Sequence, residues 1–257
     1  MEDFISVDQV TKIYQTKAGP VHALGPVGLS VASGEFIAIV GPSGCGKSTL
    51  LLLVAGLLEC TSGEVLVGGS RVTGPRTDVG IVFQTPALAE WRDVLGNVLL
   101  QVEMRRLRVH DYRNRAQQLL TSVGLEGFER RYPFELSGGM QQRTAFCRAL
   151  VHDPPLVLMD EPLGALDALT REQLRTDLER LWISSRKTVL FVTHSIVESV
   201  QLADRVVVMS PRPGVVERIV ETRLPRPRTI EVRETPQFQE CVHEITEIFL
   251  NRGVLTR

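Results

Sequence analysis

Short, nearly all-apolar runs recur along this chain of 257 residues, separated by turn residues and by helical stretches. Runs of this length and composition are typical of strands buried within a parallel sheet. They lie at 35–40, 78–84, 156–161, 188–194 and 205–209, and residues 62–69 look like a further strand that ends in a turn. Residues 5–10 instead alternate apolar and polar side chains as an edge strand does, which predicts a β edge at the N-terminus.

The middle of the chain follows helical spacing. Apolar residues recur there at steps of three and four, the period of a helix with one buried face. They are Leu95, Val98, Leu99, Val102, Ala116, Leu119, Leu120 and Val123. We therefore expect an α/β core formed by 1–87 and 154–210, a helical subdomain at 88–153, and a C-terminal extension at 211–257 that closes with a helix over 236–251.

Composition narrows the possible classes of protein. With 43% hydrophobic and 23% charged residues, the chain can bury a full core. The net charge of −1 gives no electrostatic reason to expect nucleic acid as a partner. The longest apolar run, 50–58, is about half the length that spans a bilayer, and the N-terminus lacks the basic region of a signal peptide. We expect the chain to stay in the cytoplasm.

The four cysteines, Cys45, Cys60, Cys147 and Cys241, show no C-x-x-C spacing. This spacing argues against a zinc site and against a disulfide framework, so reduced thiols are expected.

One stretch carries a specific chemical signal, because it fits the phosphate-loop pattern G-x-x-x-x-G-K-[ST] between a predicted strand and a predicted helix. Its residues are Gly41, Pro42, Ser43, Gly44, Cys45, Gly46, Lys47, Ser48 and Thr49. Glycines let backbone N–H groups curl around a phosphate, Lys47 adds a cation, and the Ser48 hydroxyl can ligate Mg²⁺. The alternative, an ordinary glycine turn, fits the flanking elements poorly. The stretch predicts a site for a nucleoside triphosphate with Mg²⁺.

Two adjacent carboxylates, Asp160 and Glu161, end the strand at 156–161. After a phosphate loop, this is where an acid that organises magnesium belongs. Successive side chains of a strand point to opposite faces, so the two acids cannot do the same work. We assign Asp160 to the metal shell through water and Glu161 to the role of base or water-orienting residue. Two solvated acids are the structural alternative.

Three further polar residues lie near predicted strands. Gln84 ends one strand and could ligate a metal or orient water, although most such glutamines are solvated. Tyr14 could stack on a nucleotide base or be an ordinary strand tyrosine. His194 ends a strand where ligands gather in parallel α/β sheets, although a lone histidine is usually structural.

A serine and two glycines, Ser137, Gly138 and Gly139, precede an amphipathic helix that ends before Asp153. Ser137 is a good helix N-cap, which is the structural interpretation. The same groups at a helix N-terminus could also hold a phosphate, which would be a second anion site.

Taken together, these motifs resemble those of the ATP-binding cassette family, over roughly residues 4–210. The resemblance implies a P-loop NTPase fold of the RecA-like type, with an inserted helical subdomain and an N-terminal β edge. It implies that Tyr14 stacks on adenine, that Gln84, Asp167 and His194 are the Q-loop, D-loop and switch residues, and that 136–140 is the family signature. In that family two cassettes pair head to tail, so that Ser137 of one copy covers the ATP bound by the other.

The sequences 160–171 and 209–214 look most like importers of nitrate, sulfonates, taurine or similar small solutes. Such a cassette hydrolyses ATP at the cytoplasmic side of the membrane, where it is bound to two permease subunits. A separate solute-binding protein delivers the solute to these subunits from outside the membrane. Two departures stand out: Met140 replaces a common glutamine in the signature, and 86–91 lacks the usual Leu-Pro-Trp. The alternatives from other classes are a soluble cassette ATPase without a transport role, and a small-molecule kinase with the same phosphate loop.

Overall fold

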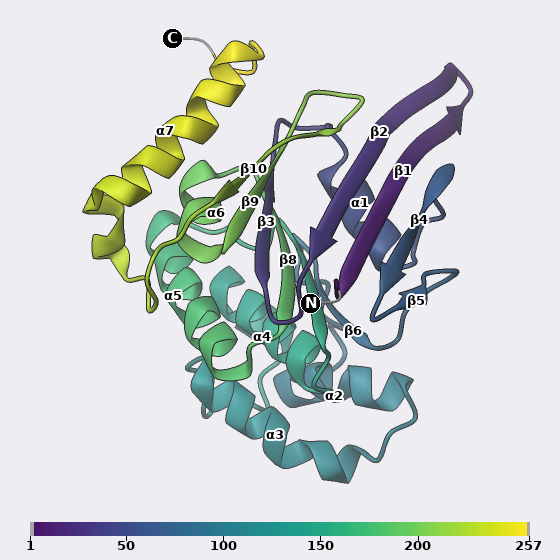
Figure 1. Cartoon of the computed structure of the whole chain (residues 1–257). Helices are drawn as coiled ribbons and strands as arrows, with labels where there is room; N and C mark the ends of the chain where they lie inside the picture. The colour runs from purple at the N-terminus through teal and green to yellow at the C-terminus, as the bar shows by residue number, and fades with distance from the viewer. Residues whose placement is uncertain (1–2, 256–257) are drawn as a thin grey trace. The chain divides into compact units, whose positions relative to one another are not determined.

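The computed structural model describes residues 3–255, which divide into two compact units (Figure 1). The first combines residues 3–76 with 183–255, and the second spans 77–182. Each unit is described by itself. Within the described residues, no helix combines the length and the apolar character that crossing a bilayer requires.

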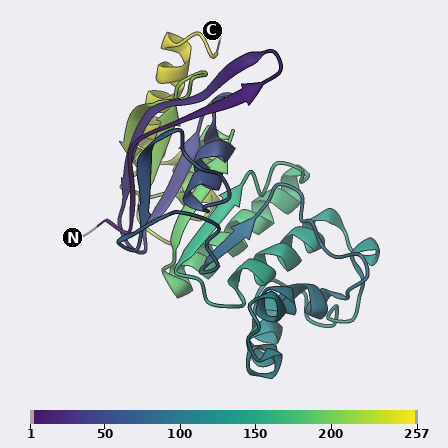
Figure 2. The same cartoon turned by 90° about the vertical axis from the view of Figure 1, so that its right-hand side faces the viewer.

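An antiparallel sheet forms one part of the first unit. Its strands run in the order β2-β1-β4-β5. Their bounds are β1 Ile5–Thr16, β2 Gly19–Val31, β4 Ser62–Val67 and β5 Ser70–Arg71. Figure 2 shows β1 and β2 as one long hairpin. The strand predicted at 5–10 is present, with Ile5 and Val7 buried, but the alternation shifts before Val10, where the pairing with β2 is irregular. It is not the edge strand that the pattern predicted, because β1 pairs with β2 on one side and with β4 on the other.

A second set of strands in this unit is mostly parallel. Strand β3 (Phe36–Val40) pairs in parallel with β8 (Thr188–Thr193) and with β9 (Arg205–Met209), while β10 (Val216–Glu221) pairs antiparallel with β9. Every residue of β3 and β8 is buried. These runs are apolar throughout because both faces of the strands are covered. Helix α1 (Lys47–Val54) contacts β8 and β4, and helix α6 (Ile196–Leu202) contacts β3.

The C-terminal extension is fastened to this unit by Arg228. Beyond β10 it forms the short helix η2 (Ile230–Glu234) and the amphipathic helix α7 (Pro236–Asn251). The buried Arg228 guanidinium donates to the carbonyl oxygens of Val200 and Ala203, at the end of α6. An arginine there satisfies carbonyls that the helix itself leaves without donors. The extension is therefore a packed part of the unit.

The second unit is mainly helical. Its two strands, β6 (Val79–Val82) and β7 (Leu156–Asp160), are parallel. Its helices are α2 Val94–Met104, α3 Val109–Ser122, η1 Pro133–Glu135, α4 Gly138–Leu150 and α5 Ala168–Ser185, the last through Trp182. The apolar residues predicted to share a helical face do so, since Leu95, Val98, Ala116 and Leu120 are buried in one core between α2, α3 and α4.

Two elements escape the sequence patterns. Strand β2 contains Gly19, Pro20, Gly25, Pro26 and Gly28, residues that usually mark turns, yet it runs for 13 residues. It lies at the edge of its sheet, where proline costs few ladder hydrogen bonds. Helix α5 mixes charged and apolar residues without a continuous apolar face. Neither local pattern predicts the element, because packing outweighs propensity in both cases.

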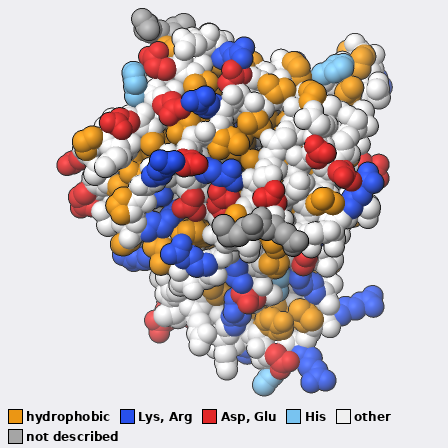
Figure 3. All heavy atoms as spheres, in the orientation of Figure 1, with side chains coloured by type: hydrophobic (Ala, Val, Ile, Leu, Met, Phe, Trp, Pro, Cys, Tyr) orange, Lys and Arg blue, Asp and Glu red, His pale blue; other side chains and the backbone are white. Residues whose placement is uncertain are grey.

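Oppositely charged side chains are interspersed over the face shown in Figure 3, in keeping with the net charge of −1. Some titratable groups are nevertheless buried, among them His152, just beyond the end of α4. Burial, together with the charges of Arg105 and Arg115, lowers the pKa of His152 to about 4, against the opposing effects of the Val79 backbone and Asp153.

This burial predicts a loss of stability in weak acid. Between pH 6.5 and about 4 the unfolded chain binds a proton at His152 that the folded chain does not. The free energy of unfolding should therefore fall as the pH falls through this range, by about 1–3 kcal/mol, and level off below it. Urea unfolding of His152→Gln at several pH values should show a shallower decline than the wild type. His110→Gln is the control, because His110 is exposed, and its stability should decline as that of the wild type does. Equal declines in the wild type and His152→Gln would contradict the assignment of the loss to His152.

Candidate functional site

The phosphate loop occupies 41–49, between the buried strand β3 and helix α1 as predicted. Gly44 and Gly46 have φ values of +75° and +102°, in the left-handed region that favours glycine. A Cβ added at Gly46 would lie 2.5 Å from Leu24 Cδ2, whereas one at Gly44 would meet no atom within 4 Å. The loop is thus packed on its Gly46 side and open on its Gly44 side, as a phosphate cradle must be.

Lys47 is buried inside this loop. Its ammonium group donates to the carbonyl oxygens of Gly41, at 2.9 Å, and Pro42, at 3.1 Å. These two bonds hold the cation where a phosphate would arrive. Cys45 is also buried, whereas Ser43 and Gly44 are exposed.

Two predicted residues lie near the loop in the same unit. The Tyr14 hydroxyl is 3.3 Å from Thr49 Oγ1, and its ring centroid is 5.3 Å from Lys12 Nζ, a cation–π contact. His194 is exposed directly after Thr193, which is the register partner of Val40. Because β3 and β8 are parallel, His194 and Gly41 leave the same edge of the strands side by side. The first unit thus brings Tyr14, the phosphate loop and His194 together.

Gln84, Asp160 and Glu161 meet in the second unit. Val82 is in register with Met159, so the chain beyond β6 and the chain beyond β7 leave one edge of the pair together. Gln84 is exposed there, and Asp160 and Glu161 are partly buried. Glu161 has a φ of +44°, a conformation that costs a residue other than glycine about 1 kcal/mol. Such strain is found at sites where the surrounding structure fixes a side chain's direction.

The signature serine is a helix cap, as the structural interpretation predicted. Ser137 Oγ accepts a hydrogen bond from the Met140 amide at 3.3 Å, at the start of α4. Ser137 and Gly138 are exposed, and Gly139 is buried. A hydroxyl that accepts one bond keeps its own proton to donate, so capping leaves Ser137 able to bind an anion.

Asp167 also caps a helix. Its Oδ1 accepts hydrogen bonds from the amides of Leu169 and Thr170, at the start of α5. Bonds from the Thr170 side chain and backbone lower the pKa of Asp167, so this exposed carboxylate is ionised at neutral pH.

Two residues that the sequence did not single out hold the segment after β6. Arg148, buried in α4, donates to the carbonyl oxygens of Pro86, at 2.6 Å, and Ala87, at 2.7 Å. Gln142, one and a half turns earlier, donates to the Phe83 carbonyl at 3.3 Å. Helix α4 thus anchors both sides of Gln84. The sequence signal that could have identified them is the presence of an arginine and a glutamine on the apolar face of the amphipathic helix α4.

Asn97 fixes the next stretch of this segment. It is fully buried, and its side chain donates to the carbonyls of Ala89, Arg92 and Asp93 and accepts from the Ala89 amide at 2.7 Å. The loop so fixed presents Trp91 with 81% of its surface exposed. A large exposed aromatic side chain on a rigid loop is typical of a protein contact.

Within the described residues, no group of three or more His, Cys, Asp and Glu side chains could hold a metal ion unaided. The donor set predicted for Mg²⁺ is of another kind, a hydroxyl, an amide and a carboxylate that acts through water. Magnesium is commonly bound by one or two carboxylates together with substrate phosphates. The open, glycine-lined loop fits a triphosphate in the same way.

Comparisons with known proteins agree with these observations. The family model described as ABC transporter matches residues 24–164. An uncharacterized ABC transporter ATP-binding protein of Methanocaldococcus jannaschii is 48% identical, over 95% of this chain and 90% of its own. An aliphatic sulfonates import ATP-binding protein of Bacillus cereus is 38% identical over 98% of both chains, and a taurine import ATP-binding protein of Jannaschia sp. is 45% identical over 88% and 86%.

A solved dimeric ATP-binding cassette, in a post-hydrolysis state bound to ADP and Pi, superposes with a TM-score of 0.75 at 33% identity. It covers 86% of this chain and 100% of its own. These matches confirm the predicted resemblance, the P-loop α/β fold class and ATP hydrolysis. The chain belongs to the ABC transporter family and is an ATP-binding subunit that hydrolyses ATP.

Proposed function

We propose that this cassette powers the uptake of a small solute of the nitrate, sulfonate or taurine kind through separate permease subunits. The phosphate loop, with Lys47 held on two loop carbonyls, is the observation that carries the ATPase. Two relatives named for sulfonate and taurine import, each matching most of this chain, support the solute class. Their names do not favour a soluble cassette without a transport role.

The solute class predicts which compound stimulates ATP hydrolysis. The chain, its permease and its solute-binding protein in liposomes should hydrolyse ATP faster with taurine, an alkanesulfonate or nitrate than without solute. A parallel assay with all three compounds identifies the solute. Intact basal hydrolysis that none of them stimulates would contradict the proposed solute class and leave the ATPase assignment standing.

We assign the nucleotide contacts as follows. The loop 41–49 cradles the phosphates, and Tyr14 stacks on adenine. Ser48, Gln84 and Asp160, the last through water, hold Mg²⁺. The ion supplies charge neutralisation at the phosphates. The Tyr14 ring already makes a cation–π contact with Lys12. Adenine would therefore either stack on the free face of the ring or displace the Lys12 ammonium group.

Glu161 is assigned as the general base. Hydrolysis needs a water aligned behind the γ-phosphate, and a carboxylate placed beside that water orients it and takes its proton. Gln84 helps to position the water, and His194 donates to the γ-phosphate. The left-handed backbone at Glu161 supports this role, because strain at a strand end points to a side chain whose direction matters.

We further propose that two copies pair head to tail around ATP. Ser137, Gly138 and Gly139 of one copy would cover the γ-phosphate held by the other copy's loop, with Asp167 at the same interface. The exposure of Ser137 and Gly138 leaves them accessible to a second copy. The dimeric cassette to which this chain is similar supports the pairing.

The shared site predicts that hydrolysis controls association. Glu161→Gln keeps the size of the side chain but loses the base, which typically costs about 10²–10⁴ in rate. ATP should then bind without cleavage and hold two chains together, whereas the wild type returns to monomer as it hydrolyses. Size-exclusion chromatography with MgATP measures this difference.

The control is Glu161→Gln combined with Ser137→Arg, in which a long side chain occupies the space that the γ-phosphate must enter. The double variant should stay monomeric. A monomeric Glu161→Gln protein, or a double variant that dimerises equally well, would show the shared-site proposal to be wrong.

The surface around 84–91, with the neighbouring helices of its unit, is our candidate for the permease contact. Asn97 and Arg148 hold this segment through backbone bonds, so Trp91 is presented without the entropic cost of ordering a loop. An apolar groove contact with a short permease helix fits such an anchor. We place the chain as a peripheral subunit at the cytoplasmic face of the membrane, with 88–153 as the subdomain that receives the permease.

Removing the anchor should uncouple hydrolysis from transport. Trp91→Ala should keep basal ATP hydrolysis in the isolated chain, because the side chain is exposed, but lower transport by roughly tenfold or more if it is a hot spot. Ile230→Ala, which truncates an exposed apolar residue of the other unit, is the matched control. Uptake into proteoliposomes at the wild-type rate by Trp91→Ala would refute the placement.

A further inference from the structure

The ring of Tyr14 is held at two points within the first unit. Lys12 Nζ lies over the ring, 5.3 Å from its centroid, and the Tyr14 hydroxyl is 3.3 Å from Thr49 Oγ1. Thr49 is the last residue of the phosphate loop and lies in the first turn of α1. One contact restrains the face of the ring and the other restrains its tip. The side chain is therefore oriented before any nucleotide binds.

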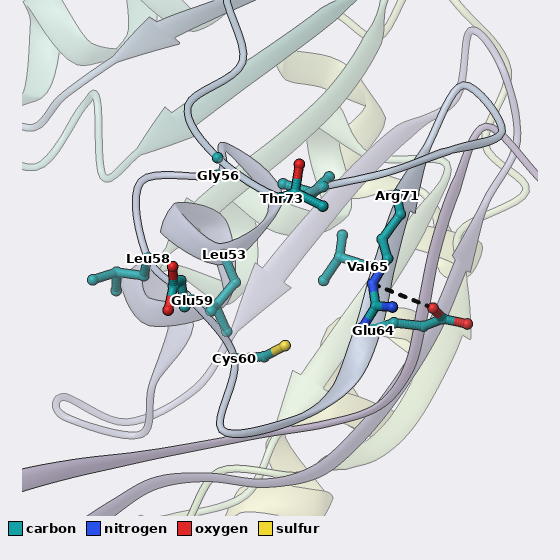
Figure 4. A pocket seen from close by; sticks show the side chains of 11 residues that line it. Leu53, Gly56, Leu58, Glu59, Cys60, Glu64, Val65, Arg71 and Thr73 are labelled. Carbon is teal, nitrogen blue, oxygen red and sulfur yellow. Dashed lines mark ion pairs between the residues drawn. The ribbon is translucent and has the colours of Figure 1, made fainter.

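The cation over the ring is itself anchored. The Lys12 ammonium group donates to the carbonyl oxygen of Glu59 at 2.6 Å, a hydrogen bond that the positive charge strengthens. Glu59 belongs to the segment 55–61, which joins the end of α1 to β4. Figure 4 shows Glu59 and Cys60 of this segment near Leu53 of α1. A backbone carbonyl moves less than a side chain does, so it gives the cation a fixed position.

Strand β1 is fastened to the same segment through its backbone. The Thr61 amide donates to the Thr11 carbonyl at 2.8 Å, and the Ile13 amide donates to Thr61 Oγ1 at 2.9 Å. A Cβ added at Gly63 would lie 2.4 Å from the carbonyl oxygen of Asp8, so the two backbones are in direct contact there. The strand and the segment therefore keep their separation, and the ammonium group between them stays in place.

No carboxylate draws this cation away. Among residues 3–255, partly buried Lys12 forms no ion pair, and its two polar contacts are the Glu59 carbonyl and the Tyr14 ring. A base that displaced the ammonium group from the ring would have to compete with a cation–π contact and move a cation that is bonded to the backbone. The face of the ring opposite Lys12 is therefore the favoured stacking surface.

We propose that Lys12 is a positioning residue for the nucleotide base and that it acts through Tyr14. Its ammonium group covers one face of the ring and holds the ring so that adenine stacks on the opposite face. Ordering an aromatic side chain in advance lowers the entropic cost of binding. The inference rests on the assignment of Tyr14 to adenine, and the experiment below separates the two.

Lys12→Met tests this role, because it keeps the length of the side chain and removes the cation. ADP is the probe, since it carries the base and is not cleaved. The Kd of the full chain for ADP, measured by isothermal titration calorimetry with Mg²⁺, should rise about three- to tenfold. The Kd for pyrophosphate, which has no base, should stay the same. An equal rise for both ligands would place the effect in the phosphate loop and overturn the proposal.

Two matched variants control for the charge. Lys12→Arg keeps a cation that can lie over the ring, so it should bind ADP as the wild type does. Lys17→Met removes an exposed lysine from the turn between β1 and β2 and should also leave the Kd for ADP unchanged. A loss of affinity in Lys12→Arg as large as that in Lys12→Met would count against the cation–π contact.

Tyr14→Ala separates the inference from the assignment on which it rests. This variant should bind ADP more weakly, and adding Lys12→Met to it should have no further effect, because the ring through which Lys12 acts is gone. If Tyr14→Ala binds ADP as the wild type does, the stacking assignment is wrong and the role of Lys12 falls with it. If only Tyr14→Ala weakens binding, or if Lys12→Met weakens it equally in both backgrounds, stacking stands and the role of Lys12 is refuted.

Discussion

A strand that must turn sharply into a helix is the constraint on which the nucleotide site depends. Strand β3 is buried on both faces, so the chain can expose polar groups only after it leaves the sheet. It does so through glycines in the left-handed region, and the helix then begins at Lys47. This turn keeps the lysine on the loop carbonyls. Glycine-rich turns before a helix direct backbone N–H groups toward a bound phosphate. Any Cβ at Gly46 would meet Leu24 and open the turn.

Helix α4 plays a comparable part in the second unit. Its first turn is capped by Ser137, the proposed phosphate contact. Further along, Gln142 and Arg148 hold the backbone on both sides of Gln84, on the segment that leads to Trp91. One rigid helix therefore joins the end proposed to meet ATP with the surface proposed to meet the permease. A displacement of α4 at either end has a direct physical route to the other.

The sequence alone determined the features that depend on spacing along the chain. The phosphate loop, the carboxylates after a buried strand, the capped signature helix and the buried helix face that carries Leu95, Val98 and Val102 all follow from residues that are close together in sequence. The roles assigned to Tyr14, Gln84, Glu161 and His194 stay predictions. Only the tertiary structure decided what depends on distant segments meeting: the edge position that makes β2 a strand, the bonds from Arg148 to Pro86 and Ala87, the left-handed backbone at Glu161, and the anchoring of Lys12 on the Glu59 carbonyl. Local patterns could not show these features, because each depends on which surfaces the folded chain brings into contact.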